Sequence, residues 1–182
     1  MAIKRCLGVD PGLSSATATV FGYGDGSIFP EILDIFDIPT KGEGTTKRID
    51  AQKFFDWLER TDPHIAYIEN ANTMPAIPDE NGFRRGMGAA SAGRYMRAAG
   101  SLETVVDLFG IDTVLIQPVT WKRALGLIGE NKGGSLELIR GLYPDCADKW
   151  FKRQKDHNRA ESALIALYGA ARCDLIKLQM AA

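Results

Sequence analysis

The stretch Cys6-Leu7-Gly8-Val9-Asp10-Pro11-Gly12 decides the fold, because it combines an apolar strand, a terminal carboxylate and a turn. Asp10 ends this apolar run, and Glu69 ends a second one over residues 65–69. Glu161 opens an apolar helical run near the C-terminus. A carboxylate at the end of a buried strand is costly unless it is paired or binds a cation. These three acids therefore predict a site for hard divalent cations such as Mg²⁺ or Mn²⁺, and two such ions can drive phosphodiester hydrolysis.

The composition is that of one globular domain, which we expect to span residues 1–182. Hydrophobic residues make up 45% and charged residues 25%, as is usual for globular proteins. No apolar run approaches the ~20 residues of a membrane helix, and the N-terminus leads directly into a strand, so we expect neither a membrane span nor a signal peptide. The three cysteines are too widely spaced for a disulfide framework or a zinc motif. This favours reduced thiols and a cytoplasmic location, in a bacterium or a phage-infected cell.

The formal net charge of −1 does not by itself indicate nucleic-acid binding. The basic residues are grouped, however. One group is Arg84, Arg85, Arg94 and Arg97, and a second, just before Glu161, is Lys149, Lys152, Arg153, Lys155 and Arg159. Such local patches allow a near-neutral protein to bind DNA, and the alternative interpretation is two solvated charged faces.

Hydrophobic periodicity predicts an α/β domain. Strands are expected over residues 3–10, 15–22, 31–38, 65–69 and 113–116. The turn at Asp10-Pro11-Gly12 predicts that the first two strands form an antiparallel hairpin. An antiparallel start followed by alternating strands and helices predicts a five-stranded mixed sheet flanked by helices.

The helices that we expect are punctuated by proline and glycine. They cover residues 47–60, 86–109, a segment opening at Pro118, 135–143 and 157–179. Asp62-Pro63 ends the first of them, and Pro144 ends the fourth. A polar loop is expected over residues 41–46 and a glycine-rich connector over 126–134. The segment 70–85 is a loop of unusual length for a compact domain, and such loops are often functional.

Three motifs, in this order along the chain, resemble the RuvC-type Holliday-junction resolvases, which have an RNase H-like fold. They are Gly8-Val9-Asp10-Pro11-Gly12, Tyr67-Ile68-Glu69-Asn70 and Arg159-Ala160-Glu161-Ser162-Ala163-Leu164-Ile165-Ala166. The segment 118–122 and the lead-in Lys155-Asp156-His157 are most similar to the phage-type branch. The resemblance covers nearly the whole chain. It implies a homodimer that binds a four-way DNA junction, cuts one strand per subunit near the crossover, requires Mg²⁺ or Mn²⁺ as two ions per site, and uses no nucleotide cofactor.

The resemblance also implies roles for the three acids. Asp10 would bridge both metal ions, and Glu69 would be the second ligand. Glu161 matches the acidic position of the last helix, where many relatives carry Asp. Each acid has a structural alternative: a turn-capping role for Asp10, a salt bridge for Glu69 and a helix-dipole interaction for Glu161.

The fourth site residue has three candidates, at positions 156–158. Bacterial resolvases carry a further Asp or His three residues before the last acid, and that position is Asn158 here. His157 and Asp156 are the candidates to replace it. His157 lies four residues before Glu161 on the same helical face and could ligate a metal or transfer a proton, whereas Asp156 could instead cap the helix.

DNA contacts are expected outside the acids. The candidates for phosphate contacts are Lys122, Lys132, Arg84, Arg85, Lys152, Arg153 and Arg159. In the resolvases a residue of the loop after the second acid wedges at the crossover; here Met74 or Phe83 could do so, or could anchor the loop on the domain. The helix over residues 86–109 matches the dimer-forming helix of the family, and ordinary packing on the sheet is the alternative.

Three other functions are alternatives to a junction resolvase. Sugar kinases and actin-like ATPases share the fold, but they need a second copy of it and the chain is too short for two. A non-catalytic junction-binding protein is compatible with Asn158 at an acidic position. A nuclease that acts on other branched DNA or on RNA–DNA hybrids would have the same catalytic core.

Overall fold

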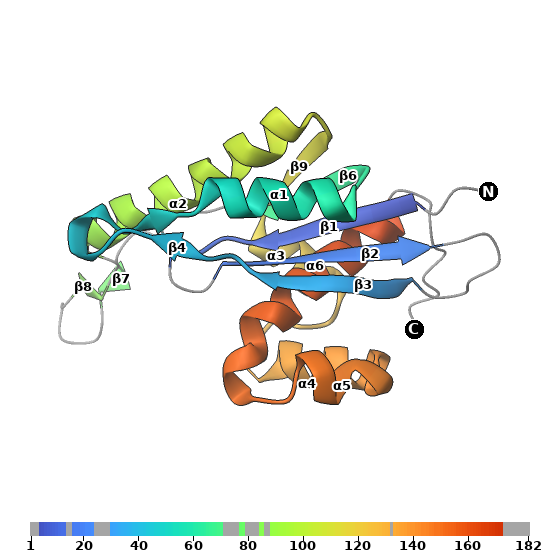
Figure 1. Ribbon diagram of the computed structural model, residues 1–182. Coiled ribbons are helices and arrows are strands. Elements are labelled where there is room, and N and C mark those ends of the chain that lie inside the picture. The colour runs from blue at the N-terminus through green and yellow to red at the C-terminus, as the bar shows by residue number, and fades with distance from the viewer. Residues whose placement is uncertain are drawn as a thin grey trace.

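Five strands form one mixed sheet in the centre of the molecule (Figure 1). The computed structural model describes residues 4–13, 16–23, 30–70, 77–78, 84–85, 88–131 and 133–172. The strands are β1 (Lys4–Asp10), β2 (Thr17–Tyr23), β3 (Glu31–Asp37), β6 (Ile65–Glu69) and β9 (Asp112–Ile116). Their order in the sheet is β3-β2-β1-β6-β9, with β1, β2 and β3 antiparallel and β6 and β9 parallel to β1. The predicted hairpin and the predicted five-stranded mixed sheet are both confirmed.

Helices cover the two faces of this sheet (Figure 1). On one face lie α1 (Ala51–Thr61) and α2 (Ala89–Phe109), and on the other lie α6 (His157–Arg172), α3 (Pro118–Ala124) and α4 (Gly134–Leu142), with α5 (Pro144–Trp150) next to α4. Each face has its own hydrophobic core. Because side chains alternate across a strand, Leu7 and Val9 of β1 join the core under α1 and α2, while Cys6 joins the core under α6.

Helix α6 lies unusually close to β1, and Gly8 is the reason. A Cβ atom on Gly8 would lie 2.3 Å from both the backbone nitrogen of Ala166 and the carbonyl oxygen of Ser162. The hydroxyls of Ser162 and Thr19 of β2 form a buried hydrogen bond of 2.8 Å, which fixes the rotation of the helix against the sheet. The strand and the helix that carry two of the predicted acids are therefore in direct contact.

Several predicted boundaries differ in the structure. The helix expected over residues 47–60 begins at Ala51, because β5 (Arg48–Ile49) pairs with β4 (Thr40–Lys41) after the short 3₁₀ turn η1 (Gly44–Thr46). The expected loop 70–85 contains a two-stranded ladder of β7 (Ile77–Pro78) and β8 (Arg84–Arg85). The last helix is described as far as Arg172, so its expected extension to residue 179 lies outside the described residues.

Residues 144–150 form α5, a helix that the sequence analysis did not anticipate. Pro144 follows the end of α4, as expected, but it also occupies the first turn of α5, where its missing N–H and fixed φ favour a helix start. The 3₁₀ turn η2 (Gln154–Asp156) then leads into α6.

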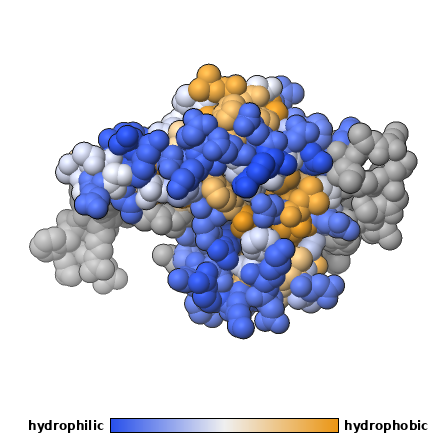
Figure 2. All heavy atoms as spheres, in the orientation of Figure 1, coloured by the Kyte–Doolittle hydropathy of each residue, from blue (hydrophilic) through white to orange (hydrophobic). Residues whose placement is uncertain are grey.

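Hydrophilic side chains cover most of the face shown in Figure 2, over α1 and over the α4–α5 layer. Among the described residues, no helix is both long and apolar enough to cross a membrane.

Candidate active site

Asp10 and Glu69 end two neighbouring strands at the same edge of the sheet. β1 and β6 are parallel, and Val9 pairs with Ile68, so that each acid is the next residue along its own strand. Alternation along β1 directs Asp10 to the same face as Gly8, which is the face that α6 covers. Both acids are buried, with 9% of each residue exposed.

Glu161 reaches the same place from α6. It lies about one turn after the first residue of the helix, beyond the first turn to which a helix-dipole interaction is largely confined. Burial raises the pKa of Asp10 well above its ordinary value, and the negative charges of Glu161 and Glu69 raise it further. The pKa of Glu69 is also raised, by burial and by Glu161. Each carboxylate thus lies close enough for its charge to affect another, and we call the three together the acidic cluster (Asp10, Glu69 and Glu161).

Two consecutive residues of α3 hold two members of the acidic cluster. The indole Nε1 of Trp121, a fully buried side chain, donates a hydrogen bond of 2.8 Å to Oε2 of Glu69. This bond offsets part of the effect of burial on the pKa of Glu69. The ammonium of Lys122 lies 3.1 Å from Oε1 of Glu161, and the Ser135 hydroxyl donates to the same oxygen at 3.4 Å.

The acidic cluster has the chemistry of a divalent-cation site. Within the described ranges, no three acidic, histidine or cysteine side chains are grouped closely enough to hold a metal ion as they stand. Trp121 and Lys122 engage one oxygen each of Glu69 and Glu161. The residues nevertheless fit a hard cation, since they supply carboxylate oxygens from two buried acids and one half-buried acid, and a positive ammonium already contacts Glu161.

Asp156 is not brought together with the acidic cluster. Its Oδ2 accepts a hydrogen bond of 2.7 Å from the backbone N–H of Arg153, and its Oδ1 lies 2.7 Å from Nη2 of the same residue. Burial by itself raises the pKa of Asp156, but the hydrogen bonds and charge of Arg153 outweigh burial and lower it. The carboxylate thus closes the η2 turn before α6.

The other two candidates for the fourth position begin α6. Nδ1 of His157 lies 3.2 Å from the carbonyl oxygen of Gln154. The carbonyl oxygen of Asn158 accepts a 2.7 Å hydrogen bond from the hydroxyl of Thr17, the residue that pairs with Asp10 across β1 and β2. The start of α6 therefore lies beside the acidic cluster, and the identity of a fourth site residue stays a prediction.

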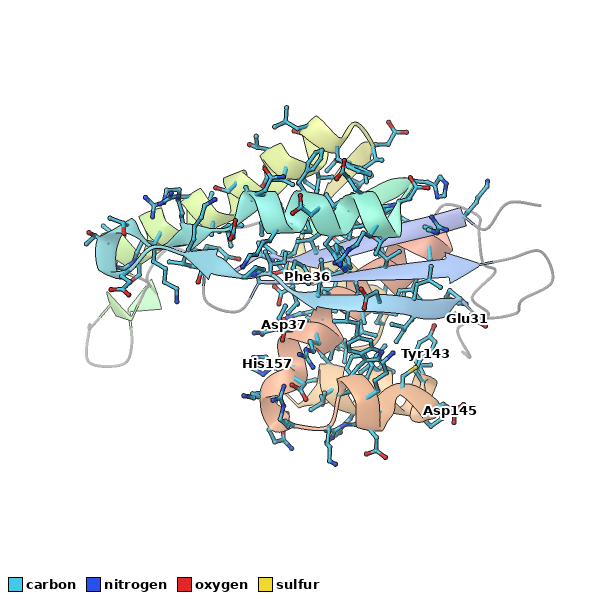
Figure 3. The ribbon with its side chains drawn as sticks, in the orientation of Figure 1. Glu31, Phe36, Asp37, Tyr143, Asp145 and His157 are labelled. Carbon is cyan, nitrogen blue, oxygen red and sulfur yellow. The ribbon has the colours of Figure 1, made fainter. Side chains whose placement is uncertain are left out.

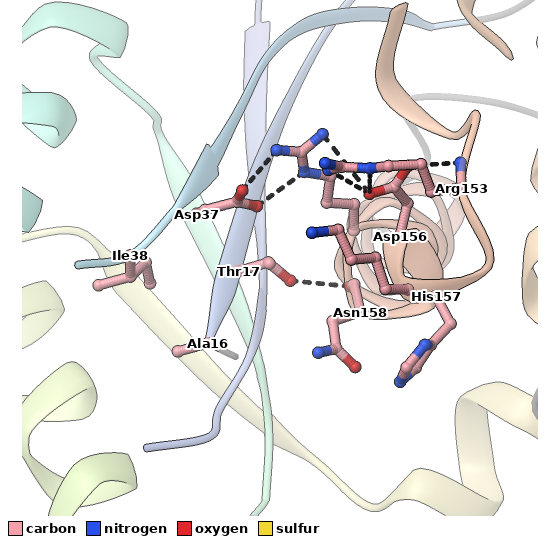
Figure 4. A pocket seen from close by; sticks show the side chains of 10 residues that line it. Ala16, Thr17, Asp37, Ile38, Arg153, Asp156, His157 and Asn158 are labelled. Carbon is pink, nitrogen blue, oxygen red and sulfur yellow. Dashed lines mark hydrogen bonds and ion pairs between the residues drawn. The ribbon is translucent and has the colours of Figure 1, made fainter. Parts of the chain in front are cut away.

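A cavity of about 440 Å³, which we call the basic cavity, opens next to this helix start (Figure 4). Its charged and titratable lining residues are Arg153, Lys155, Arg159, His157, Asp37 and Asp156. Figure 3 shows His157 at the end of α6 that faces Asp37 of β3. Nε of Arg159 donates a 2.7 Å hydrogen bond to Asp37, and this pairing raises the pKa of the guanidinium further.

The structure places the remaining predicted DNA contacts at different points. Arg84 and Arg85 form strand β8, and Lys152 is exposed between α5 and η2. Lys132, Met74 and Phe83 lie outside the described residues.

Tyr95 is a residue near the site that sequence reasoning missed. It comes from α2, on the opposite helical layer. Burial, and then the negative charges of the acidic cluster, raise its pKa to about 12. A tyrosine within a glycine- and alanine-rich helix carried no motif, so the sequence offered no signal for it.

Comparison with known proteins defines the class of fold. No family model and no curated protein matches the chain. Solved structures do, and they have the RuvC-like RNase H fold with this five-stranded mixed sheet. The fold expected from the motifs is therefore confirmed.

Three of these structures are Holliday-junction resolvases of different origins. The RuvC of Thermus thermophilus in complex with a Holliday junction substrate has a TM-score of 0.66 and 18% identity, with 94% of this chain and 96% of that chain covered. The yeast mitochondrial resolvase Ydc2 has a TM-score of 0.61 and 17% identity, with 91% and 77% covered. The fowlpox virus resolvase has a TM-score of 0.59 and 13% identity, with 93% and 99% covered.

Proposed function

We propose that this protein is a metal-dependent endonuclease that resolves four-way DNA junctions by paired phosphodiester hydrolysis. The observation that carries the proposal is the acidic cluster: Asp10, Glu69 and Glu161 come from three distant segments and meet at one edge of a RuvC-like sheet. The structures with this fold include resolvases solved with junction DNA. A single domain that spans the whole chain and a cytoplasmic location are part of the same proposal.

Asp10, Glu69 and Glu161 would hold Mg²⁺ or Mn²⁺, which supplies an activated water and stabilises charge on the phosphate and on the leaving 3′-oxygen. The chain prepares the site for this chemistry. Trp121 fixes one oxygen of Glu69, and Ser135 orients Glu161. Lys122 supplies a positive charge next to the place where the phosphodiester would lie. His157 lines the neighbouring basic cavity, from which it could exchange a proton with solvent.

The DNA would approach from the side of the basic cavity. Lys155 lines the cavity and Lys152 is exposed just before its lining residue Arg153, and both suit phosphate contacts that position the strand without reading its sequence. The guanidinium groups of Arg153 and Arg159 are paired with Asp156 and Asp37, so a phosphate would have to share them. Two cuts in opposed strands require two sites, and we therefore propose a homodimer.

The test is cleavage of a labelled synthetic four-way junction beside linear duplex, flap and RNA–DNA hybrid controls. Each substrate is incubated with Mg²⁺ or with EDTA. The variants are wild type, Asp10→Asn, and Asp145→Asn, which makes the same change at an exposed position of α5 (Figure 3). We expect paired symmetric nicks in the junction with wild type and Asp145→Asn, and none with EDTA or Asp10→Asn.

The other outcomes separate the alternatives. Preferential cutting of flaps or hybrids would support the proposed metal site but show that the substrate is not a four-way junction. Tight junction binding without cutting, in Mg²⁺ and in Mn²⁺, would indicate a non-catalytic junction-binding protein. Asn158, which stands where relatives carry an acid, favours that alternative.

A further inference from the structure

The ammonium of Lys122 contacts one carboxylate of the acidic cluster, and its charge acts on the other two. Nζ is 3.1 Å from Oε1 of Glu161. The same charge lowers the pKa values of Asp10 and Glu69, which are otherwise raised by burial. One lysine therefore acts on all three acids that would ligate a metal ion.

The position of this ammonium is determined by α3. Trp121 is fully buried and bonded to Glu69, so the backbone of its neighbour Lys122 is held next to the cluster. Nζ lies 5.0 Å from the centroid of the Trp121 ring, which is a favourable position for a cation over an aromatic face. The Lys122 side chain is 32% exposed, so it has a route from the cluster into solvent.

We propose that Lys122 is a built-in counter-ion that a divalent cation must displace when it binds the acidic cluster. The inference rests on the metal site of the proposed function and adds that Lys122 and the metal ion compete for that site. A divalent cation and the ammonium compete for the carboxylate of Glu161, of which Lys122 already holds one oxygen, and the two positive charges repel each other. In the metal-free protein Lys122 reduces the repulsion among the two buried acids and the half-buried Glu161, and after displacement its ammonium is free to contact a DNA phosphate.

The experiment measures metal binding alone, without DNA and without turnover. Mg²⁺ is titrated by calorimetry into protein stripped with EDTA. Lys122→Met keeps an unbranched side chain, one atom shorter, and removes its charge. Arg123→Met removes one charge from the next residue of α3, an exposed side chain, and is the matched control for a general change of net charge. Lys122→Arg keeps a cation at the site.

We expect Lys122→Met to bind Mg²⁺ about three- to tenfold more tightly than wild type, since it removes the competing ion pair. Arg123→Met should stay within about twofold of wild type, and Lys122→Arg should bind no more tightly than wild type. Mg²⁺ should also change the tryptophan fluorescence of wild type as the ammonium leaves the Trp121 ring, and this change should be smaller in Lys122→Met.

Three results would contradict the proposed counter-ion role of Lys122. Unchanged or weaker Mg²⁺ binding by Lys122→Met, in a variant that still melts cooperatively, would mean that Lys122 does not compete with the metal. If the wild-type protein binds Mg²⁺ in that case, the proposed metal-dependent nuclease would still stand. Equal tightening by Arg123→Met and Lys122→Met would mean that net charge alone sets the affinity. Wild type that binds no Mg²⁺ at all would overturn both the counter-ion and the metal-dependent function.

Discussion

Asp10 shows at the scale of one residue how a functional group can cost stability. Its carboxylate is buried beside two other acids, and its pKa is raised, so the folded protein favours the protonated form more than the unfolded chain does. Ionisation at neutral pH therefore destabilises the metal-free fold. We expect Asp10→Asn, which is neutral at every pH, to melt at a higher temperature than wild type in EDTA at pH 7.5.

The same substitution should reduce metal-dependent cleavage by more than about a hundredfold, because it removes a proposed metal ligand. Differential scanning calorimetry and the junction assay measure the two effects. A lower melting temperature in EDTA would show that the carboxylate stabilises the fold, contrary to the electrostatic argument. Asp145→Asn controls for the amide substitution itself.

Trp121 contributes through a hydrogen bond as well as through its packing. Its indole donates to Glu69 inside the protein, and groups that orient a metal ligand typically change affinity by 10–100-fold when removed. Trp121→Phe keeps a buried ring and removes the donor. We expect the Mg²⁺ concentration for half-maximal cleavage to rise about tenfold. An unchanged Mg²⁺ requirement would show that Trp121 contributes only to core packing and does not orient Glu69 for metal binding.

At the scale of elements, the contact between β1 and α6 brings Asp10 and Glu161 together. Gly8→Ala would place a Cβ atom 2.3 Å from backbone atoms of α6, and backbone cannot move aside as a flexible side chain can. We expect a loss of about 3 kcal/mol in the free energy of unfolding, together with weaker cleavage because α6 must shift.

Gly100→Ala is the matched control for this contact. Gly100 lies inside α2, and a Cβ atom there meets no atom within 4 Å, so alanine should stabilise that helix by about 0.5–1 kcal/mol. Urea denaturation measures both variants. Equal effects at the two glycines would contradict the close approach of α6.

The η2 turn that precedes α6 depends on an ionised aspartate. The pKa of Asp156 is lowered in the fold, so its contribution to stability is present above the ordinary pKa of Asp and is lost as pH falls through the folded value. We expect Asp156→Asn to cost about 1 kcal/mol at pH 7, a value limited by the exposure of Arg153.

The difference between wild type and Asp156→Asn should shrink only in acid, below about pH 4. Chemical denaturation from pH 3 to pH 8 measures it. If the difference in unfolding free energy instead disappeared as pH rises, the pKa of Asp156 would be raised by folding, contrary to this argument. The exposed Asp148 provides an Asp→Asn control on the neighbouring helix.

At the scale of the whole molecule, the acidic cluster joins three segments that are far apart in sequence. β1, β6 and α6 must all be folded before the three carboxylates meet, so a cation that binds them binds the native state alone. Mg²⁺ at about 100 times its dissociation constant should then raise the melting temperature by about 5–10 °C. Thermal melts with Mg²⁺ and with EDTA measure the shift, and Asp10→Asn should lose most of it.

Much of the architecture could be predicted because its signals are local. The apolar runs that end in Asp10 and Glu69 predicted β1 and β6, and the Asp-Pro-Gly turn predicted the β1–β2 hairpin. α5 was missed because Pro144 was interpreted only as a helix end, although proline also favours a helix start. The β4–β5 and β7–β8 ladders were missed because two-residue strands have no periodicity to detect.

The sequence by itself determined which acids could form a site, because strand alternation and helical spacing place their side chains. Only the tertiary structure decided what surrounds them. It placed Lys122 against Glu161, Trp121 against Glu69, and Asp156 against Arg153. These partners come from α3 and η2, whose positions depend on the packing of α6 against Gly8. Partner choice among charged groups follows from distance and burial, which are properties of the folded chain and have no local pattern in the sequence.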